Sequence, residues 1–431
     1  MTKKTRNKKQ ETRNKKQKKR IKNQESRIKN QESRIKMQSI AETEIKGLAE
    51  ITGIVRKIVD GESNEKTLKG HTLRVNKMIE LVHGNAENVG NIASCSHDKT
   101  IKIWNSESGE CVKTLEGHTS VVNDIIELVD GSLLSCSRDK SIKLWNVESG
   151  LCIKTFYHNF GVNKLINLKY GKEEGIISVA SFSQDEIIIW HLNESIAWKF
   201  SHQSPSKIIT NAIELSNGKI AIVHTGVSRI RDNIIKIWNP YAKRTSILTL
   251  TLEGHDRKIN DIIELTRKSI NESTRKRIAT CSEDGKIMIW DADNGECIKT
   301  LLGHTKCINK IIELDDGKIA SCSRDGTIKI WDYNATEECL YTIECNNRNT
   351  FFKNLLELKH GDSKGNIASF NSTINQVVNI WDLNTRKCVK TLNGHKNRIH
   401  DILELNCEKN GNVGKIASCS CDVKIWPRII L

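Results

Sequence analysis

The chain has 431 residues, a formal net charge of +16 and only 5% aromatic residues. It contains no signal peptide and no run of 18 apolar residues, which argues against secretion and against a membrane-spanning helix. It also lacks a phosphate-binding glycine loop, a metal-ligand cluster and an isolated nucleophile. We therefore expect an intracellular, non-enzymatic protein of the cytoplasm or nucleus, without catalytic residues, metal or cofactor.

Residues 1–39 form a basic segment with a composition of its own. They hold 16 Lys or Arg against 3 Glu, in five seven-residue units such as SRIKNQE, whereas the remaining 52 basic and 49 acidic residues nearly balance. Each unit offers at most one apolar seam position, which favours a solvated low-complexity tail over a coiled coil. The run KKQKKR at 15–20 leaves nuclear import or contact with nucleic acid open.

Residues 40–64 are expected to form a short amphipathic helix and a linker. Ser39 and Glu42 have the spacing of a capping box, and apolar residues follow at near-helical spacing. The side of the domain that follows is the default surface for this helix.

Residues 65–431 repeat one pattern, which is clearest in GHTKCINKIIELDDGKIASCSRDGTIKIWD at 303–332. Each copy predicts four strands: a (CINKIIEL), b (GKIASCS), c (TIKIWD) and d (ECIKTL). Self-similarity at about 40 to 45 residues is the signature of propeller blades. Eight copies end strand c on a tryptophan: Trp104, Trp145, Trp190, Trp238, Trp290, Trp331, Trp381 and Trp426.

This pattern resembles the WD-repeat (WD40) β-propeller family, which implies an all-β, eight-bladed fold and a role as a protein–protein interaction scaffold. The last copy stops after strand c, so we expect residues 65–69 to supply its missing strand and close the ring. Repeats 3, 4 and 7 depart from the pattern at or near Asp185, His202, Asp232 and Asn375, and we expect them to be the least rigid.

The resemblance implies a hydrogen-bond network in each blade that joins the histidine of the GH pair, a strand b serine, the aspartate of the b–c turn and the strand c tryptophan. Such a set looks like a catalytic triad, but its repetition favours a structural role. The matching residues are His71, Asp98 and Trp104; His118, Asp139 and Trp145; His255, Asp284 and Trp290; His304, Asp325 and Trp331; and His395, Asp422 and Trp426.

The family also implies that the b–c and d–a loops form one exposed face. Arginines there suit bidentate binding of carboxylate or phosphate, which predicts acidic or phosphorylated segments of other proteins as partners. For that function we expect Arg138, Arg231 and Arg324 to converge around the central axis. The candidate binding residues on this face are Arg74, His97, Arg138, Arg231, Lys258, Arg324 and Arg398.

Two alternatives to a general scaffold stay open. The repeat style is similar to F-box/WD-repeat ubiquitin-ligase receptors, which implies a substrate receptor, although no F-box is visible in the first 64 residues. The basic residues 1–39 instead favour a nucleic-acid-associated factor of the nucleus or of ribosome assembly. In either case we expect a monomeric propeller.

Four further positions recur in the repeats. Ten cysteines occupy equivalent places in strands b and d, and we expect them to be small buried core residues. One position near the start of strand a never places like charges in neighbouring repeats, which predicts pairing between blades. It holds Lys77, Asp124, Lys164, Asn211, Asp261, Lys310, Asn354 and Asp401. A glutamate near the end of strand a, replaced only by Asn167, predicts a solvated mouth of a central channel.

Overall fold

The computed structural model describes residues 65–85, 87–169, 177–184, 186–192, 196–201, 207–226, 233–241, 248–266, 276–344, 351–360, 363–371, 376–407, 411 and 413–429. The predictions for residues 1–39 and 40–64 lie outside these ranges. The same holds for the predictions at Asp185, His202, Arg231, Asp232 and Asn375.

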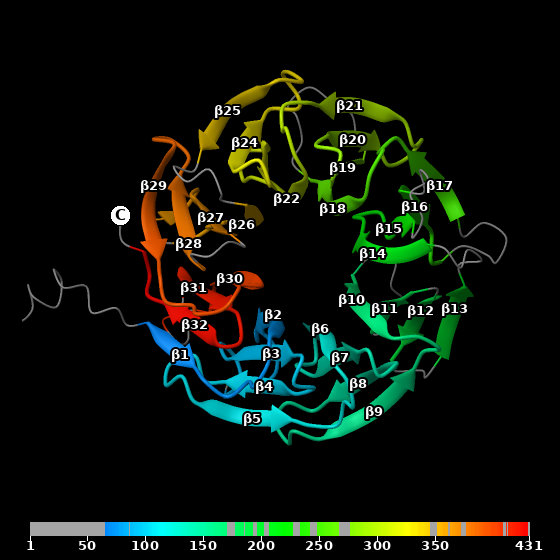
Figure 1. The fold of residues 1–431 in the computed structure, drawn as a ribbon. Helices are drawn as coiled ribbons and strands as arrows, with labels where there is room; N and C mark the ends of the chain where they lie inside the picture. Colours follow the sequence, from blue (N-terminus) through cyan, green and yellow to red (C-terminus); the bar gives the residue numbers. More distant parts are fainter. Residues whose placement is uncertain are drawn as a thin grey trace, which may run out of the picture. The chain divides into compact units, whose positions relative to one another are not determined.

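Residues 65–431 fold into eight four-stranded antiparallel sheets arranged around a central axis (Figure 1). This confirms the predicted all-β, eight-bladed propeller. In blades 1 to 7 the strands follow chain order from the axis outward, as expected for consecutive hairpins. The innermost strands, of type a, are β2 (Val75–Glu80), β6 (Val122–Glu127), β10 (Val162–Leu168), β14 (Lys207–Glu214), β18 (Ile259–Leu265), β22 (Ile308–Glu313), β26 (Phe352–Glu357) and β30 (Asp401–Leu405).

Strands b and c form the middle of each blade. The b strands are β3 (Ile92–Ser96), β7 (Leu133–Ser137), β11 (Ser178–Ser183), β15 (Ile220–Gly226), β19 (Arg277–Ser282), β23 (Ile319–Ser323), β27 (Ile367–Asn371) and β31 (Lys415–Cys419). The c strands are β4 (Ile101–Trp104), β8 (Ser141–Trp145), β12 (Glu186–His191), β16 (Ile234–Trp238), β20 (Ile287–Asp291), β24 (Thr327–Trp331), β28 (Val378–Asp382) and β32 (Val423–Trp426).

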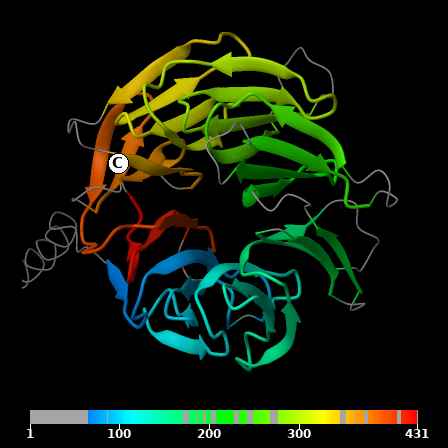
Figure 2. The ribbon, with the colours of Figure 1, turned by 45° about the vertical axis from the view of Figure 1, so that its right-hand side comes forward.

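The outermost strands, of type d, lie at the rim of the ring (Figure 2). They are β5 (Cys111–Leu115), β9 (Cys152–Tyr157), β13 (Ile196–Ser201), β17 (Leu248–Glu253), β21 (Cys297–Leu301), β25 (Cys339–Glu344), β29 (Lys387–Leu392) and β1 (Lys66–Leu68). Blades 1 to 7 each contain four consecutive strands from β2 to β29, and blade 8 contains β30, β31, β32 and β1.

The ring is closed by the first strand of the chain, as the sequence predicted. β1 pairs with β32, with Lys66 opposite Ile425 and Leu68 opposite Val423. An ion pair between Lys424 and Glu65 lies beside this pairing. Because β1 supplies the missing d strand, the last blade has no unpaired edge at β32.

The core lies between neighbouring blades. One cluster joins Leu81, Ile101 and Ile103 of blade 1 to Ile125 and Trp145 of blade 2, and equivalent clusters follow around the ring. Strands b are buried along their whole length in most blades, because both faces of a blade contact a neighbour. Stability therefore depends on contacts between adjacent repeats.

The prediction for the cysteines was half wrong. The b-strand residues Cys95, Cys136, Cys281, Cys322 and Cys419 are fully buried. In strand d, however, Cys111, Cys152, Cys297 and Cys388 are exposed and Cys339 is partly exposed. Both positions repeat with the same period, but strand d is the outer edge of each sheet, where alternate residues face solvent.

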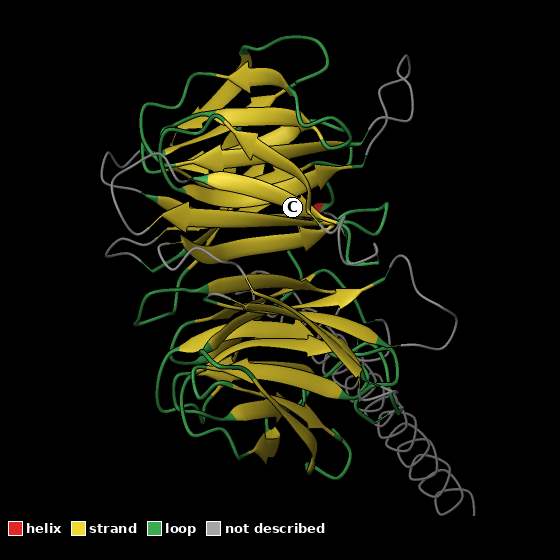
Figure 3. Ribbon diagram, turned by 90° about the vertical axis from the view of Figure 1, so that its right-hand side faces the viewer, coloured by secondary structure: helices red, strands yellow, loops and turns green. Residues whose placement is uncertain are grey.

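The loops gather at two opposite ends of the strands (Figure 3). The d–a loops and b–c turns form what we call the upper face, and the a–b and c–d connections form the lower face. Every innermost strand runs from the upper face to the lower face, so equivalent residues of the eight repeats form rings at fixed heights.

Candidate functional site

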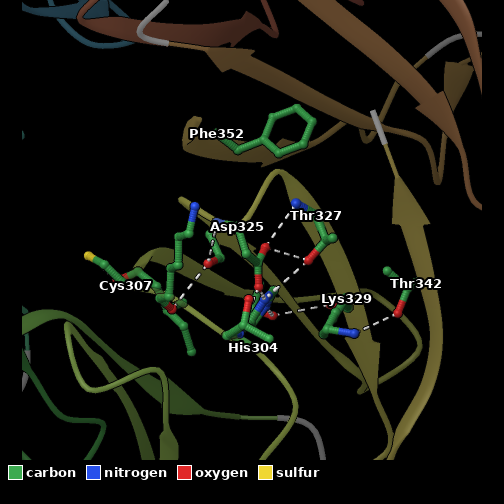
Figure 4. A network of polar contacts seen from close by, with 12 residues as sticks. His304, Cys307, Asp325, Thr327, Lys329, Thr342 and Phe352 are labelled. Atoms are coloured by element: carbon green, nitrogen blue, oxygen red, sulfur yellow. Dashed lines mark hydrogen bonds and ion pairs between the residues drawn. The ribbon is translucent and has the colours of Figure 1, made fainter. Parts of the chain in front are cut away.

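In blade 6, the predicted network of polar side chains is complete (Figure 4). His304 Nδ1 lies 2.7 Å from Asp325 Oδ2, and His304 Nε2 lies 2.8 Å from Ser321 Oγ. Trp331 Nε1 donates to the same Ser321 oxygen at 2.8 Å. Burial lowers the pKa of His304, so the imidazole is neutral and can donate from Nδ1 while it accepts from the serine hydroxyl.

Four other blades repeat these contacts with distances of 2.7–2.9 Å. Their acceptor hydroxyls are fully buried, so no substrate could reach them as nucleophiles. Burial and repetition support our interpretation that the network is structural rather than catalytic. The residues are His71, Asp98 and Trp104; His118, Asp139 and Trp145; His255, Asp284 and Trp290; and His395, Asp422 and Trp426.

Blade 3 builds the network with a residue that the sequence analysis missed. His158 Nε2 lies 2.7 Å from Ser181 Oγ, which also accepts from Trp190 at 2.7 Å. The carboxylate comes from Glu186, whose Oε2 lies 3.5 Å from His158 Nδ1. The longer side chain reaches the histidine from β12, across a b–c turn that is shorter than in the regular blades.

The ring of alternating charges near the axis pairs across several blade boundaries, as predicted. Lys77 Nζ lies 2.6 Å from Asp124, and Lys310 Nζ lies 3.0 Å from Asp261. Lys164 also contacts Asn211. These lysine side chains are about one-third exposed at most, so each pair helps to order the blades more than it stabilises them.

The glutamates near the end of strand a are not simply a solvated mouth, because each one binds the neighbouring blade. Glu127 accepts from the backbone N–H groups of Val82 and His83 at 2.8 and 3.0 Å. Glu404 does the same with Lys359 and His360. We call these contacts glutamate latches. They are formed by Glu80, Glu127, Glu214, Glu264, Glu313, Glu357 and Glu404.

A second set of contacts between blades lies at the upper end of strand a. The amide of Asn76 donates to the carbonyl of Val122 at 2.8 Å, and Asn260 donates to Ile308 at the same distance. Asn123 and Asn309 make the equivalent bonds to blades 3 and 7. In blades 7 and 8, the equivalent position holds Lys353 and His400 instead of asparagine.

Basic side chains gather on the upper face over blades 7, 8, 1 and 2. Arg74, His97 and Arg138 line one pocket of about 270 Å³ together with three asparagines. Arg398 is close enough to Arg74 to lower its pKa, after the larger effect of burial. We call this set the cationic cluster: Arg74, His97, Arg138, Lys353, Arg398 and His400.

Like charges in the cationic cluster act on one another. Burial, followed by Arg74 and Arg398, lowers the pKa of Lys353. Burial and the same cations lower the pKa of His400 to about 3, so its imidazole is neutral, and its buried Nδ1 has no hydrogen-bond partner. Among the described residues, no carboxylate forms an ion pair with the cluster's arginines or with Lys353, so an incoming anion would be attracted.

The other predicted residues of this face lie apart from the cluster. Arg324 lines a larger pocket of about 720 Å³ over blades 5, 6 and 7. Lys258 lies nearby, because its carbonyl accepts from the N–H of Glu283, another residue of that pocket. Arg138 and Arg324 thus occupy equivalent b–c turns but separate pockets. Since Arg231 is outside the described ranges, the predicted convergence of the three arginines stays a prediction.

Sequence reasoning missed Lys353 and His400 because it compared only two positions of the upper face. Lys353 is the second residue of β26 and His400 directly precedes β30. Both stand at the repeat position where four other blades carry the asparagines that bind their neighbours. An alignment of the eight repeats at that position would have shown the two basic replacements.

No helix within the described part of the chain is long and apolar enough to cross a membrane. Within the same ranges, no group of three or more His, Cys, Asp or Glu residues is placed to hold a metal ion.

Comparisons with known proteins agree with the architecture. The WD40 family (WD domain, G-beta repeat) matches residues 62–105, 109–146, 246–291 and 295–332. These segments contain strands a to c of blades 1, 2, 5 and 6. Each of these blades has the complete network and a full-length b–c turn.

Several curated proteins are similar to parts of the chain. Nuclear distribution protein PAC1 of Fusarium vanettenii is 28% identical over 246 residues, which cover 52% of this chain and 53% of that protein. PAC1 of Arthroderma benhamiae is 32% identical over 88 residues, 20% of this chain and 19% of that protein. F-box/WD repeat-containing protein A of Dictyostelium discoideum is 25% identical over 164 residues, 34% of this chain and 13% of that protein.

The chain thus spans about half or less of the length of these relatives. The matched repeats, the eight sheets and the recurring His–Ser–Trp network all point to one architecture. The chain is an eight-bladed WD-repeat β-propeller, a fold that typically serves as a non-enzymatic scaffold for protein interactions.

Proposed function

We propose that this propeller is an interaction scaffold that binds acidic or phosphorylated segments of other proteins at the cationic cluster. The observation that carries the proposal is the gathering of basic side chains from four adjacent blades, where no described carboxylate forms an ion pair with the arginines or with Lys353. Elsewhere on the ring, lysines such as Lys77 and Lys310 do have acidic partners.

The chemistry of the cluster fits such a partner. Arg74, Arg138 and Arg398 are exposed, and a guanidinium can hold a carboxylate or phosphate through two parallel hydrogen bonds. An anion would also relieve the repulsion between the arginines and Lys353. A segment with several negative charges is favoured over a single one, because the cluster spans blades 7, 8, 1 and 2.

The test is binding of a fluorescein-labelled peptide of alternating glutamate and glycine to the full chain, measured by anisotropy at 150 mM salt. We expect Arg398→Ala and Arg138→Ala each to weaken binding about 3- to 10-fold, since one charge-assisted bond is worth about 1–2 kcal/mol at an exposed site. Lys387→Ala removes an equal charge from the exposed outer strand β29 and should leave affinity unchanged. Equal losses in all three variants would contradict a localised site.

Residues 1–39 are present in every variant, so their contribution to peptide binding is the same in all of them. The expected monomeric state, the location in cytoplasm or nucleus and the contact of residues 1–39 with nucleic acid stay predictions. A nucleic-acid function would show as oligonucleotide binding with a steep salt dependence that cluster substitutions leave unchanged.

A further inference from the structure

The larger pocket of the upper face has a different chemistry from the cationic cluster. It lies where blades 5, 6 and 7 meet and measures about 720 Å³, within the range typical of ligand pockets. Blade 5 contributes Glu283, blade 6 contributes Lys306, Cys307 and Arg324, and blade 7 contributes the phenyl ring of Phe351. The proposed acidic-segment site has no aromatic residue among its members.

The blade 5 side of the pocket carries charges of both signs, including the carboxylate of Glu283 and the guanidinium of Arg257. Asp256 pairs with Lys286 at 2.8 Å, and Asp284 pairs with His255 at 2.8 Å. On the blade 6 side, Arg324 is exposed and forms no ion pair with any described residue. The pocket therefore presents positive charge from both sides, from Arg257 of blade 5 and from Arg324 on the blade 6 wall.

An apolar surface adjoins that wall. Phe351 is 37% exposed, and Lys306 Nζ lies 5.9 Å from the centre of its ring. Cys307 lies beside it with only 9% of its surface exposed. Its sulfur accepts from Asn260 at 3.2 Å and lies 3.5 Å from the side-chain oxygen of Asn309. The asparagines are fixed by their bonds to neighbouring blades, so this apolar wall is preformed.

We propose that this pocket is a second subsite for a partner segment in which one acidic residue is followed by an aromatic residue. The acidic side chain would bind Arg324 and Lys306, and the aromatic ring would pack on Phe351 beside Cys307. The carboxylate of Glu283 would repel a second acidic residue, so this subsite selects against the polyacidic segments that suit the cationic cluster.

The inference extends the proposed scaffold function but uses separate residues, so the two can fail independently. A partner that contacts both sites would span the upper face, and its two weak contacts would combine through effective concentration. The affinity of a peptide for this subsite alone is expected to be modest. The test therefore compares matched peptides rather than absolute affinities.

The test uses the full chain and a fluorescein-labelled peptide Gly-Ser-Glu-Phe-Ser-Gly. We expect it to bind at least 5-fold more tightly than the matched peptides with Gln in place of Glu or Ala in place of Phe. Phe351→Ala and Arg324→Ala should each remove that preference, whereas Arg138→Ala should retain it. All three side chains are exposed, so these variants are expected to fold, and thermal unfolding checks this.

A second measurement locates the peptide without a substitution. Alkylation of cysteines by iodoacetamide, followed by peptide mass spectrometry, should slow at Cys307 and stay unchanged at Cys297, an exposed thiol on β21 of blade 5. Equal affinity for the three peptides, or loss of binding in Arg138→Ala alone, would overturn the subsite and leave the cationic cluster standing. The opposite outcome would support the subsite and overturn the cationic cluster. In that outcome, binding of the Glu-Phe peptide depends on Arg324 and Phe351, while substitutions in the cluster leave the affinity for the glutamate-rich peptide unchanged.

Discussion

The two ends of the innermost strands carry opposite charges, and these charges differ in whether they have hydrogen-bond or ion-pair partners. At the lower face, seven glutamates accept hydrogen bonds from backbone N–H groups of the adjacent blade. At the upper face, basic residues of blades 7, 8, 1 and 2 gather, and no described carboxylate forms an ion pair with the arginines or with Lys353. A repeated charge can therefore be structural or available for binding, and its partners decide which.

The same contrast holds within one position. Asn76, Asn123, Asn260 and Asn309 bind the next blade, while Lys353 and His400 replace them where the cationic cluster lies. These two replacements give up a contact between blades and add a basic side chain to the upper face. Buried or crowded groups without partners are costly, so their presence favours a role in binding.

The largest effect is expected where a latch is removed. Glu404 is 5% exposed and accepts from two backbone N–H groups. Glu404→Ala should lower the free energy of unfolding by about 2–3 kcal/mol, because both donors lose their acceptor. Chemical denaturation measures this, and Glu404→Gln, which keeps one acceptor oxygen, should lose about half as much. The affinity of folded Glu404 variants for the acidic peptide should not change. A loss of affinity together with the loss of stability would show that the two ends are not independent.

A smaller change in the free energy of unfolding, of opposite sign, is expected at the boundary between blades 2 and 3, which has no glutamate latch. Asn167 stands where the other blades carry glutamate, and its buried Oδ1 has no hydrogen-bond partner. Asn167→Glu should place a carboxylate against the backbone of blade 2 and raise the free energy of unfolding by up to about 1 kcal/mol. Asn167→Ala serves as the control for loss of the amide alone. Destabilisation by the glutamate would show that the blade 2–3 boundary has a different geometry.

The smallest effect concerns pH. Burial raises the pKa of Asp401 from its ordinary value of 3.8 to about 6, despite opposing bonds from the backbone of Met78 and the charge of Lys77. The folded state therefore favours the protonated acid. The associated stability is present below pH 3.8 and is lost as the pH rises through 6.

Asp401→Asn mimics the protonated acid. It should thus stabilise the protein by about 0.5–1 kcal/mol at pH 7.5, discounted for partial exposure, and by much less at pH 4. Thermal unfolding at the two pH values measures the difference. A larger gain at pH 4 than at pH 7.5 would contradict the sign of the shift.

The sequence was enough to predict the ring because all eight copies carry the same strand pattern and end strand c on a tryptophan. It also placed β1 in the last blade, since that copy lacked its strand d. The partners of the glutamates could not be predicted, because the N–H groups they bind belong to another blade. Exposure of the d-strand cysteines, such as Cys297, was missed because a period does not tell which side of an edge strand faces solvent.

The cationic cluster was only partly predictable, because it also joins residues of different blades. Arg74, Arg138 and Arg398 were identified from their loop positions, which the repeat register fixes. Lys353 and His400 lie in or directly before inner strands, where basic residues are usually paired, and only the structure shows them beside the arginines. Arg324 was grouped with these arginines from its loop position, and the structure places it in a different pocket.

The most direct test of the distinction between the two ends is cross-linking mass spectrometry with a glutamate-rich peptide that carries a photoreactive group. The glutamates of the lower face are hydrogen-bonded, whereas the arginines of the cationic cluster form no ion pair within the described part of the chain. This difference predicts cross-links to the loops around Arg74, Arg138 and Arg398. It also predicts none to the segments around His83 and His360, beside the latches. Cross-links concentrated at the lower face, or spread equally over both, would contradict the account.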